Sequence, residues 1–185
     1  MSDATPVTIR RATAADAQTV QLLLLELADH EGSGQHVHVD TPRWREMLAE
    51  PDVVVLLAEH DGQPVAYVSA VRRLSLWQGR NFLALDDLYV REPYRGQRVG
   101  ECLMRAVASY AATDHSVVRW ELNADNDGAR RFYLRLGATV RDKGIATWQP
   151  HDYTALLAQE PGGSPGATPA LDGEAGSTPN DHREQ

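Results

Sequence analysis

The stretch from residue 82 to residue 112 constrains the fold most, because it joins a buried strand to a helix through one short turn. Residues 82–90 are apolar except at Asp86 and Asp87, a composition typical of a strand with a covered face. Two glycines and three arginines lie in the turn and its junction with the helix, and residues 100–112 then follow helical spacing. Such a turn offers free backbone N–H groups and the positive end of a helix dipole, which together bind phosphate. Taken alone, the turn is equally well interpreted as an exposed basic connection without a ligand.

The remaining pattern predicts a mixed α/β fold with one dominant sheet. Asp61-Gly62 lies between two apolar runs and predicts a two-residue hairpin turn, and Thr41-Pro42 predicts a helix start with Thr41 as the cap. The expected order of elements is β-α-α-β-β-β-α-β-α-β. The expected strands are residues 7–11, 53–59, 65–71, 82–90, 117–122 and 146–148, and the expected helices are residues 14–31, 41–49, 100–112 and 127–136.

Composition sets the C-terminal segment apart from the rest of the chain. Residues 161–185 hold five of the fourteen glycines and four of the ten prolines, and Leu171 is their one large apolar residue. Such a segment cannot bury enough apolar surface to offset the entropy of ordering it, so we expect it to be disordered. The sequence therefore predicts one folded domain over residues 1–160 and a disordered acidic tail over residues 161–185.

Charge and hydropathy exclude several classes of partner. The net charge of −8 makes nucleic acid a poor partner and favours a cationic small molecule. The longest aliphatic run, residues 53–58, is far shorter than the roughly 18 residues that a membrane span requires, and no signal peptide is visible. We therefore expect a cytoplasmic protein with no membrane partner. With Cys102 as the one cysteine, and His36 and His38 without a third ligand, no metal site is predicted.

A second motif spans residues 126–138 and has the pattern of a short helix that ends at Gly137. Phe132 and Leu136 share one face of this helix, with Tyr133 beside them. A tyrosine in such a position is more often a half-buried packing residue than a catalytic one. The motif alone therefore favours a structural role for Tyr133.

Together the two segments resemble the GNAT superfamily of acetyl-CoA-dependent N-acetyltransferases. Residues 95–100 are similar to that family's R/Q-x-x-G-x-G/A turn, with Arg98 where the family usually has glycine. Residues 126–138 match the family's N-x-x-A-x-x-F-Y-x-x-x-G-A/F segment throughout. The resemblance covers roughly residues 7–157 and implies an α/β fold with a mixed, mostly antiparallel central sheet flanked by helices.

Three shorter segments are most similar to the diamine (spermidine/spermine) N-acetyltransferase branch. Residues 9–16, 26–31 and 85–90 resemble its I-R-x-A-T-A-A-D, E-L-A-x-Y-E and L-E-D-F-F-V motifs. Asp86 stands where that branch has glutamate, which is one methylene longer. The branch implies a homodimer that takes acetyl-CoA as co-substrate.

The resemblance implies direct attack of the amine on the thioester in a ternary complex. Asp86 would be the general base and Tyr133 the general acid that protonates the departing sulfur. Backbone N–H groups of residues 88–90 would stabilise the developing oxyanion. Strand alternation predicts that Asp86 and Asp87 point to opposite faces. The residues implied to bind acetyl-CoA are Leu88, Tyr89, Val90, Arg95, Gly96, Gln97, Arg98, Val99, Gly100, Glu101, Asn126 and Tyr133.

The implied acceptor is a primary amine, namely a diamine, a polyamine or another small cationic amine. The residues implied to bind it are His30, Glu31, Asp86, Asp87 and Glu121, although Glu31 and Glu121 also fit ordinary exposed acids. Two alternatives stay open. The acetylated amine could belong to an antibiotic, an amino acid or a protein, or the chain could be a non-catalytic acyl-CoA-binding module.

Overall fold

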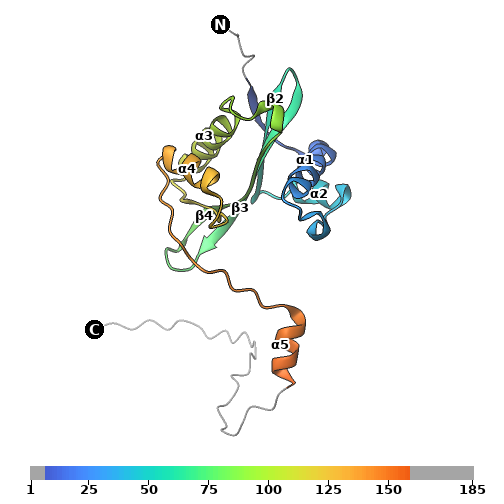
Figure 1. Ribbon diagram of the computed structural model, residues 1–185, viewed down its shortest axis with the longest axis vertical. Coiled ribbons are helices and arrows are strands. Elements are labelled where there is room, and N and C mark those ends of the chain that lie inside the picture. The colour runs from blue at the N-terminus through green and yellow to red at the C-terminus, as the bar shows by residue number, and fades with distance from the viewer. Residues whose placement is uncertain (1–6, 159–185) are drawn as a thin grey trace, which may run out of the picture. The chain divides into compact units, whose positions relative to one another are not determined.

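The computed structural model describes residues 7–158, and a five-stranded sheet forms the centre of the compact unit that ends at Arg141 (Figure 1). The strands lie in their sequence order; the first four pair antiparallel, and the fifth runs parallel to the fourth. They are β1 (Thr8–Arg11), β2 (Val53–His60), β3 (Gln63–Ser75), β4 (Arg80–Val90) and β5 (Val118–Arg119). The predicted α/β fold with a mixed, mostly antiparallel sheet flanked by helices is confirmed.

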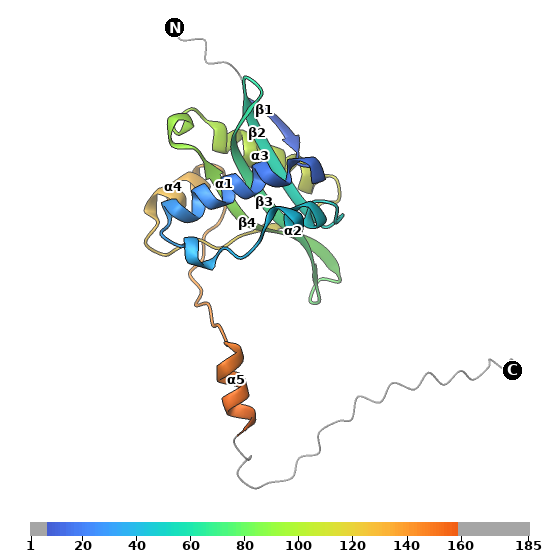
Figure 2. The same ribbon diagram turned by 90° about the vertical axis from the view of Figure 1, so that its right-hand side faces the viewer.

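Helices cover both faces of this sheet. On one face lie α1 (Ala17–His30) and α2 (Thr41–Met47), which Figure 2 shows in front of the strands. On the other face lies α3 (Val99–Ala112), followed in the chain by α4 (Asp127–Arg135). Each face has its own core because apolar residues of the strands alternate between the two sides. Val20, Leu23 and Trp44 pack against Leu57 and Tyr67 on the first face, and Leu103 and Val107 pack against Val68 and Leu83 on the second.

The predicted hairpin turn between β2 and β3 is confirmed. Asp61 and Gly62 have φ angles of 51° and 74°, and His60 pairs with Gln63 on either side of them. Positive φ at both central residues is the requirement of a type I′ turn, whose twist matches that of the strands it joins. The turn therefore brings β2 and β3 together as an antiparallel pair, and β3 in turn pairs with β4, whose end lines the site.

Three local expectations were wrong. Residues 146–148 form no strand; they belong to a second unit that begins at Asp142, where the helix α5 (Pro150–Leu157) follows them. A strand persists by pairing with another, and residues 146–148 pair with none in the described chain. β5 has two residues instead of six, and α2 is capped by Asp40, whose Oδ1 accepts from the Arg43 N–H at 2.8 Å.

Two further expectations from the sequence concern the C-terminal tail and the absence of a membrane span. The predicted disordered tail, residues 161–185, lies outside the described residues. Within residues 7–158, no helix combines the length and the apolar character needed to cross a membrane.

Candidate active site

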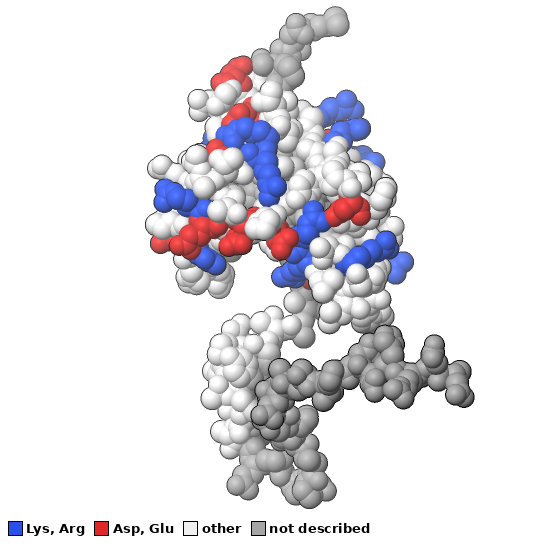
Figure 3. Space-filling model, turned by 180° about the vertical axis from the view of Figure 1, so that it is seen from behind, with Lys and Arg blue, Asp and Glu red and all other residues white. Residues whose placement is uncertain are grey.

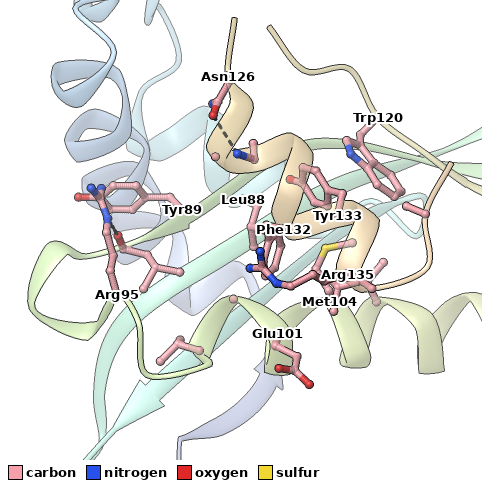
Figure 4. A pocket seen from close by; sticks show the side chains of 18 of the residues that line it. Leu88, Tyr89, Arg95, Glu101, Met104, Trp120, Asn126, Phe132, Tyr133 and Arg135 are labelled. Carbon is pink, nitrogen blue, oxygen red and sulfur yellow. Dashed lines mark hydrogen bonds between the residues drawn. The ribbon is translucent and has the colours of Figure 1, made fainter. Parts of the chain in front are cut away.

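A cleft runs along the end of β4, between the start of α3, the C-terminal end of α1 and helix α4 (Figure 4). Its volume is about 1890 Å³, above the roughly 300–1,000 Å³ of pockets that hold drug-sized molecules. Leu88, Val90, Met104 and Phe132 give it an apolar wall, and charged side chains of α3 and α4, together with Glu31 just after α1, also line it. The cleft therefore has room for a ligand with both a long apolar part and charged groups.

The edge of β4 is open along this cleft. β5 is two residues long and pairs with the first half of β4, whereas β4 continues to Val90. On its other side, β4 is hydrogen-bonded to β3. This pairing continues as far as the bond from the Arg91 N–H to the Val65 carbonyl, which is 3.0 Å long. Residues of an antiparallel strand alternate between bonding toward one neighbour and toward the other. Leu88 and Val90 therefore direct their backbone groups to the open side, and the Val90 carbonyl accepts from Arg95 Nε at 2.9 Å there.

The turn before α3 presents backbone N–H groups at the start of that helix. The N–H of Cys102 bonds to the carbonyl of Arg98 at 3.0 Å, so the three N–H groups before it have no partner within the helix. Gly96 and Arg98 take φ angles of 75° and 65°, which turn the chain sharply into the helix. A Cβ at Gly100 would lie 3.5 Å from the Phe132 ring, an ordinary contact distance, so the helix start lies against the aromatic wall. Free N–H groups and a positive dipole end fit a diphosphate.

Tyr133 lies in the wall of the cleft on α4. Asn126 starts this helix, because its Oδ1 accepts from the Ala129 N–H at 2.9 Å. The Tyr133 ring packs 4.8 Å from the Trp120 ring and 5.1 Å from the Phe132 ring, measured between centroids, and the residue is 7% exposed. Burial raises the pKa of its phenol above the ordinary value. The hydroxyl is therefore protonated at neutral pH and able to donate a proton.

Asp86 occupies a β-bulge in β4, which the sequence-based alternation did not predict. Asp87 pairs with Ser69 and Leu85 with Ala70, so Asp86 has no opposite residue on β3. Leu85 and Leu88 then pack in the same core cluster although they are three residues apart. Because Asp86 and Asp87 both fall between two side chains of one face, the expectation that they point to opposite faces was wrong.

The two carboxyl groups at the bulge differ in their surroundings. Asp87 is anchored, because its Oδ2 accepts from Ser69 Oγ at 2.8 Å. The pKa of Asp86 is raised, first by loss of hydration and then by the charge of Asp87, while Arg73 acts in the opposite direction. A carboxylate whose proton is held more tightly is also a stronger base. The bulge therefore provides one anchored acid and one of raised basicity.

Comparison with known proteins identifies the family. A model described as the acetyltransferase (GNAT) family matches residues 20–138. The chain belongs to this family. It is 31% identical over 147 residues to a thialysine N-epsilon-acetyltransferase of Bos taurus, which covers 71% of this chain and 84% of that protein. It is also 31% identical over 135 residues to an aminoalkylphosphonate N-acetyltransferase of Salmonella typhimurium, which covers 70% of this chain and 82% of that protein.

Solved structures agree with this assignment at the level of the fold. An aminoglycoside acetyltransferase from an uncultured soil metagenomic sample superposes with a TM-score of 0.69 at 15% identity, over 77% of this chain and 95% of that one. A ribosomal-protein-alanine N-acetyltransferase from Brucella melitensis gives a TM-score of 0.63 at 19% identity, over 78% of this chain and all of that one. The protein is thus a GNAT acetyltransferase, and the family uses acetyl-CoA.

The cleft of this GNAT chain brings together most of the residues singled out from the sequence. They come from the end of α1, the end of β4, the turn into α3 and helix α4. The predicted residues that line the cleft are His30, Glu31, Leu88, Tyr89, Val90, Arg95, Gly96, Arg98, Val99, Gly100, Glu101, Asn126 and Tyr133.

Four predicted site residues do not line the cleft. The Gln97 side chain turns back, and its amide donates to the Pro93 carbonyl at 2.8 Å. Glu121 is exposed just after β5, where the chain has left the sheet. Asp86 and Asp87 lie at the bulge. Buried Tyr67 lies between Asp87 and the cleft, because the pKa of its phenol is raised first by burial and then by Asp87 and by the cleft residue Glu31.

Tyr67 is a residue near the site that the sequence analysis missed. It lies in the buried centre of β3, and its ring centroid is 6.5 Å from that of the cleft residue Tyr89. A tyrosine within a run of apolar strand residues has the pattern of a core side chain, so no sequence pattern singles Tyr67 out. The absence of a metal site stays a prediction from the sequence; among residues 7–158, no three or more His, Cys, Asp or Glu side chains gather in a way that could hold a metal ion.

The left-handed conformation of Arg98 leads to a prediction about stability. Non-glycine residues in this region are strained by roughly 1–2 kcal/mol, whereas glycine is not. We expect Arg98→Gly to keep or raise the melting temperature, by up to about 2–4 °C. Gly96→Ala, which places a side chain at the other positive φ, should lower it by a similar amount. Differential scanning calorimetry on both variants checks this, and equal losses in the two would contradict it.

Proposed function

We propose that this chain transfers the acetyl group of acetyl-CoA to a primary amine of a small cationic acceptor, in a ternary complex. The observation that carries the proposal is that one cleft joins a diphosphate cradle, an open strand edge and a buried phenol. Acetyl-CoA carries a diphosphate, a long arm and a reactive thioester. The cradle fits the diphosphate, the open strand edge fits the arm, and the buried phenol fits the thioester. The homodimer and the cytoplasmic location stay predictions.

The residues that would hold acetyl-CoA lie on three elements, α3, β4 and the start of α4. The N–H groups of Val99, Gly100 and Glu101 would bind the diphosphate, helped by the dipole of α3. The outward backbone groups of Leu88 and Val90 would bind the arm, since β5 leaves that edge unpaired there. Asn126 uses its Oδ1 to cap α4, so it would contact the arm through its remaining amide group or through the helix that it starts.

The chemical step needs a base, an oxyanion site and an acid. Asp86 would take the proton of the acceptor ammonium, directly or through water, so that the neutral nitrogen attacks the thioester carbon. A backbone N–H at Leu88 or Val90 would stabilise the negative charge that develops on the carbonyl oxygen. As the carbon–sulfur bond breaks, Tyr133 would give its phenolic proton to the departing thiolate. The products are the acetylated amine and CoA with a free thiol.

The acceptor side of the cleft carries the case for a cationic amine. Glu31 lines the cleft, Glu31 and Asp87 both raise the pKa of the buried Tyr67 phenol, and Asp86 adjoins Asp87 at the bulge. Elsewhere, on the face that Figure 3 shows, acidic and basic side chains are interspersed. Attraction of a cation would therefore come from this local group of acids. The relatives named for thialysine, aminoalkylphosphonate and aminoglycoside substrates are consistent with an amine but differ in its surroundings.

This arrangement predicts a preference among acceptors. We expect a higher kcat/KM for spermidine or a short diamine than for a monoamine of equal length, because the second ammonium group meets a carboxylate. Added salt should reduce the preference, since exposed charges are screened. The measurement is thiol release from acetyl-CoA with a panel of amines. Equal kcat/KM for neutral or singly charged amines would contradict the diamine proposal and leave the acetyltransferase assignment standing.

A further inference from the structure

Three arginines surround one carboxylate at the α3 side of the cleft. Glu101 lies in the first turn of α3, and its Oε1 accepts from Nε and Nη2 of Arg105 at 3.1 and 2.9 Å. Arg98 Nε lies 3.6 Å from the other oxygen, Oε2. Figure 4 shows Arg135 reaching from α4 toward α3. We call Arg98, Arg105 and Arg135 the arginine cluster, and all three line the cleft with Glu101.

The arginine cluster carries more positive charge than Glu101 neutralises. The pKa of Glu101 is lowered, first by the hydrogen bond from Arg105 and also by the charges of Arg98 and Arg135, so the groups act on one another. Three guanidinium groups face one carboxylate, which leaves a local positive surplus in a chain of net charge −8. Arg135 makes no side-chain hydrogen bond or ion pair with any residue from 7 to 158. A positive surplus in an acidic chain points to an anionic ligand.

Two members of the arginine cluster, Arg105 and Arg135, lie away from the diphosphate cradle, whereas Arg98 directly precedes it at the start of α3. Arg105 lies four residues beyond Glu101, a distance of about 6 Å along the helix axis from the N–H groups of the cradle. Arg95, the remaining arginine of the turn that lines the cleft, points the other way, toward the Val90 carbonyl. Besides the diphosphate, acetyl-CoA has a separate phosphate group. This group is attached to the 3′ position of the ribose whose 5′ position carries the diphosphate. In acetyl-CoA, one ribose ring separates the diphosphate from the 3′-phosphate. In the protein, about one helical turn separates the N–H groups at the start of α3 from Arg105.

We propose that the arginine cluster binds the 3′-phosphate of acetyl-CoA and makes the chain select CoA over 3′-dephospho-CoA. The inference rests on the proposed function, because it assumes that acetyl-CoA occupies the cleft. Guanidinium groups suit this role, since their planar donors form paired hydrogen bonds to phosphate oxygens. Arg135 and Arg105 are the principal ligands, and Glu101 holds Arg105 in place until phosphate takes over one of its donors.

Calorimetric titration with CoA and with 3′-dephospho-CoA tests this directly. We expect the wild-type chain to bind CoA about 10- to 100-fold more tightly, the value of one or two hydrogen bonds to a charged group. In the double variant Arg105→Gln/Arg135→Gln, this preference should fall to twofold or less, while the affinity for 3′-dephospho-CoA changes little. Arg80→Gln, which removes an arginine outside the cleft, is the matched control and should keep the full preference.

Glu101→Gln gives a second variant with the opposite expected sign. Removing the carboxylate frees Arg105 and deletes a negative charge near phosphate, so CoA should bind more tightly while 3′-dephospho-CoA gains less. Equal affinity of the wild type for both ligands would overturn the inference and leave the acetyltransferase proposal intact. An equal loss for both ligands in the double variant would overturn it as well, because the arginines would then act on the diphosphate. Absence of binding by either ligand would overturn the proposed function and this inference together.

Discussion

Tyr133→Phe should lower kcat by about 100-fold, the low end of the effect of losing a general acid. The phenylalanine ring keeps the contacts with Trp120 and Phe132, so the melting temperature and the affinity for acetyl-CoA should change little. KM should also change little, because the proton is needed in the transition state and not for binding. High pH should give no rescue, since the variant has no proton to donate at any pH. Steady-state kinetics across a pH series measures the fall in kcat, the unchanged KM and the absence of rescue at high pH.

Tyr110→Phe is the matched control for this prediction. Tyr110 loses the same hydroxyl, but it lies on α3 outside the cleft, where its OH accepts from Arg72 at 3.4 Å. We expect this variant to retain the full kcat. A Tyr133→Phe enzyme that turns over within about twofold of the wild type would show that Tyr133 is a packing residue.

Asp86→Asn should lower kcat/KM by about 100-fold or more at neutral pH, because the acceptor ammonium loses its base. In contrast to the tyrosine variant, activity should recover in part at high pH, where the amine loses its proton to solvent. Stability should move in the opposite direction from activity. The folded state raises the pKa of Asp86, so above that pKa the charged carboxylate is less favourable in the folded chain than in the unfolded one. Removing the charge should therefore leave the melting temperature unchanged or raised at neutral pH.

Asp87→Asn separates the base from its neighbour. The charge of Asp87 raises the pKa of Asp86, so its removal should lower that pKa and shift the acidic limb of the kcat/KM profile to lower pH. The same change weakens the hydrogen bond from Ser69, so this variant should lose stability where Asp86→Asn does not. If the acidic limb stays in place in both variants, another group is the base.

Local patterns predicted the parts of the fold that depend on neighbouring residues. The Asp61-Gly62 turn follows from the positive φ angles that these two residue types tolerate, and the start of α3 follows from helical spacing after a glycine-bearing turn. The residues of the phosphate-binding turn and of α4 could be selected because each group lies within one short segment. The cleft confirms that these two segments meet.

Features that depend on distant pairing could not be predicted. At the Asp86 bulge, the pairing of β4 with β3 shifts its register between Ser69 and Ala70. The sequence of one strand does not show how it pairs with another, so this shift could not be predicted. The bidentate pair of Glu26 with Arg91, at 2.7 and 2.8 Å, joins α1 to the end of β4 across 65 residues of sequence. The arginine cluster likewise combines α3 with α4. Glu26, Arg91, Arg105 and Arg135 look like ordinary exposed charges in the sequence until the fold brings them to their partners.

The central claim is that the cleft moves an acetyl group from a thioester to an amine. The most direct measurement counts free thiol and acetylated amine in the same reaction, with acetyl-CoA and spermidine as substrates. The account predicts equal amounts of both products, formed together and only when the amine is present. Thiol release that is no faster with any amine than without one, or release without acetylated amine, would contradict it.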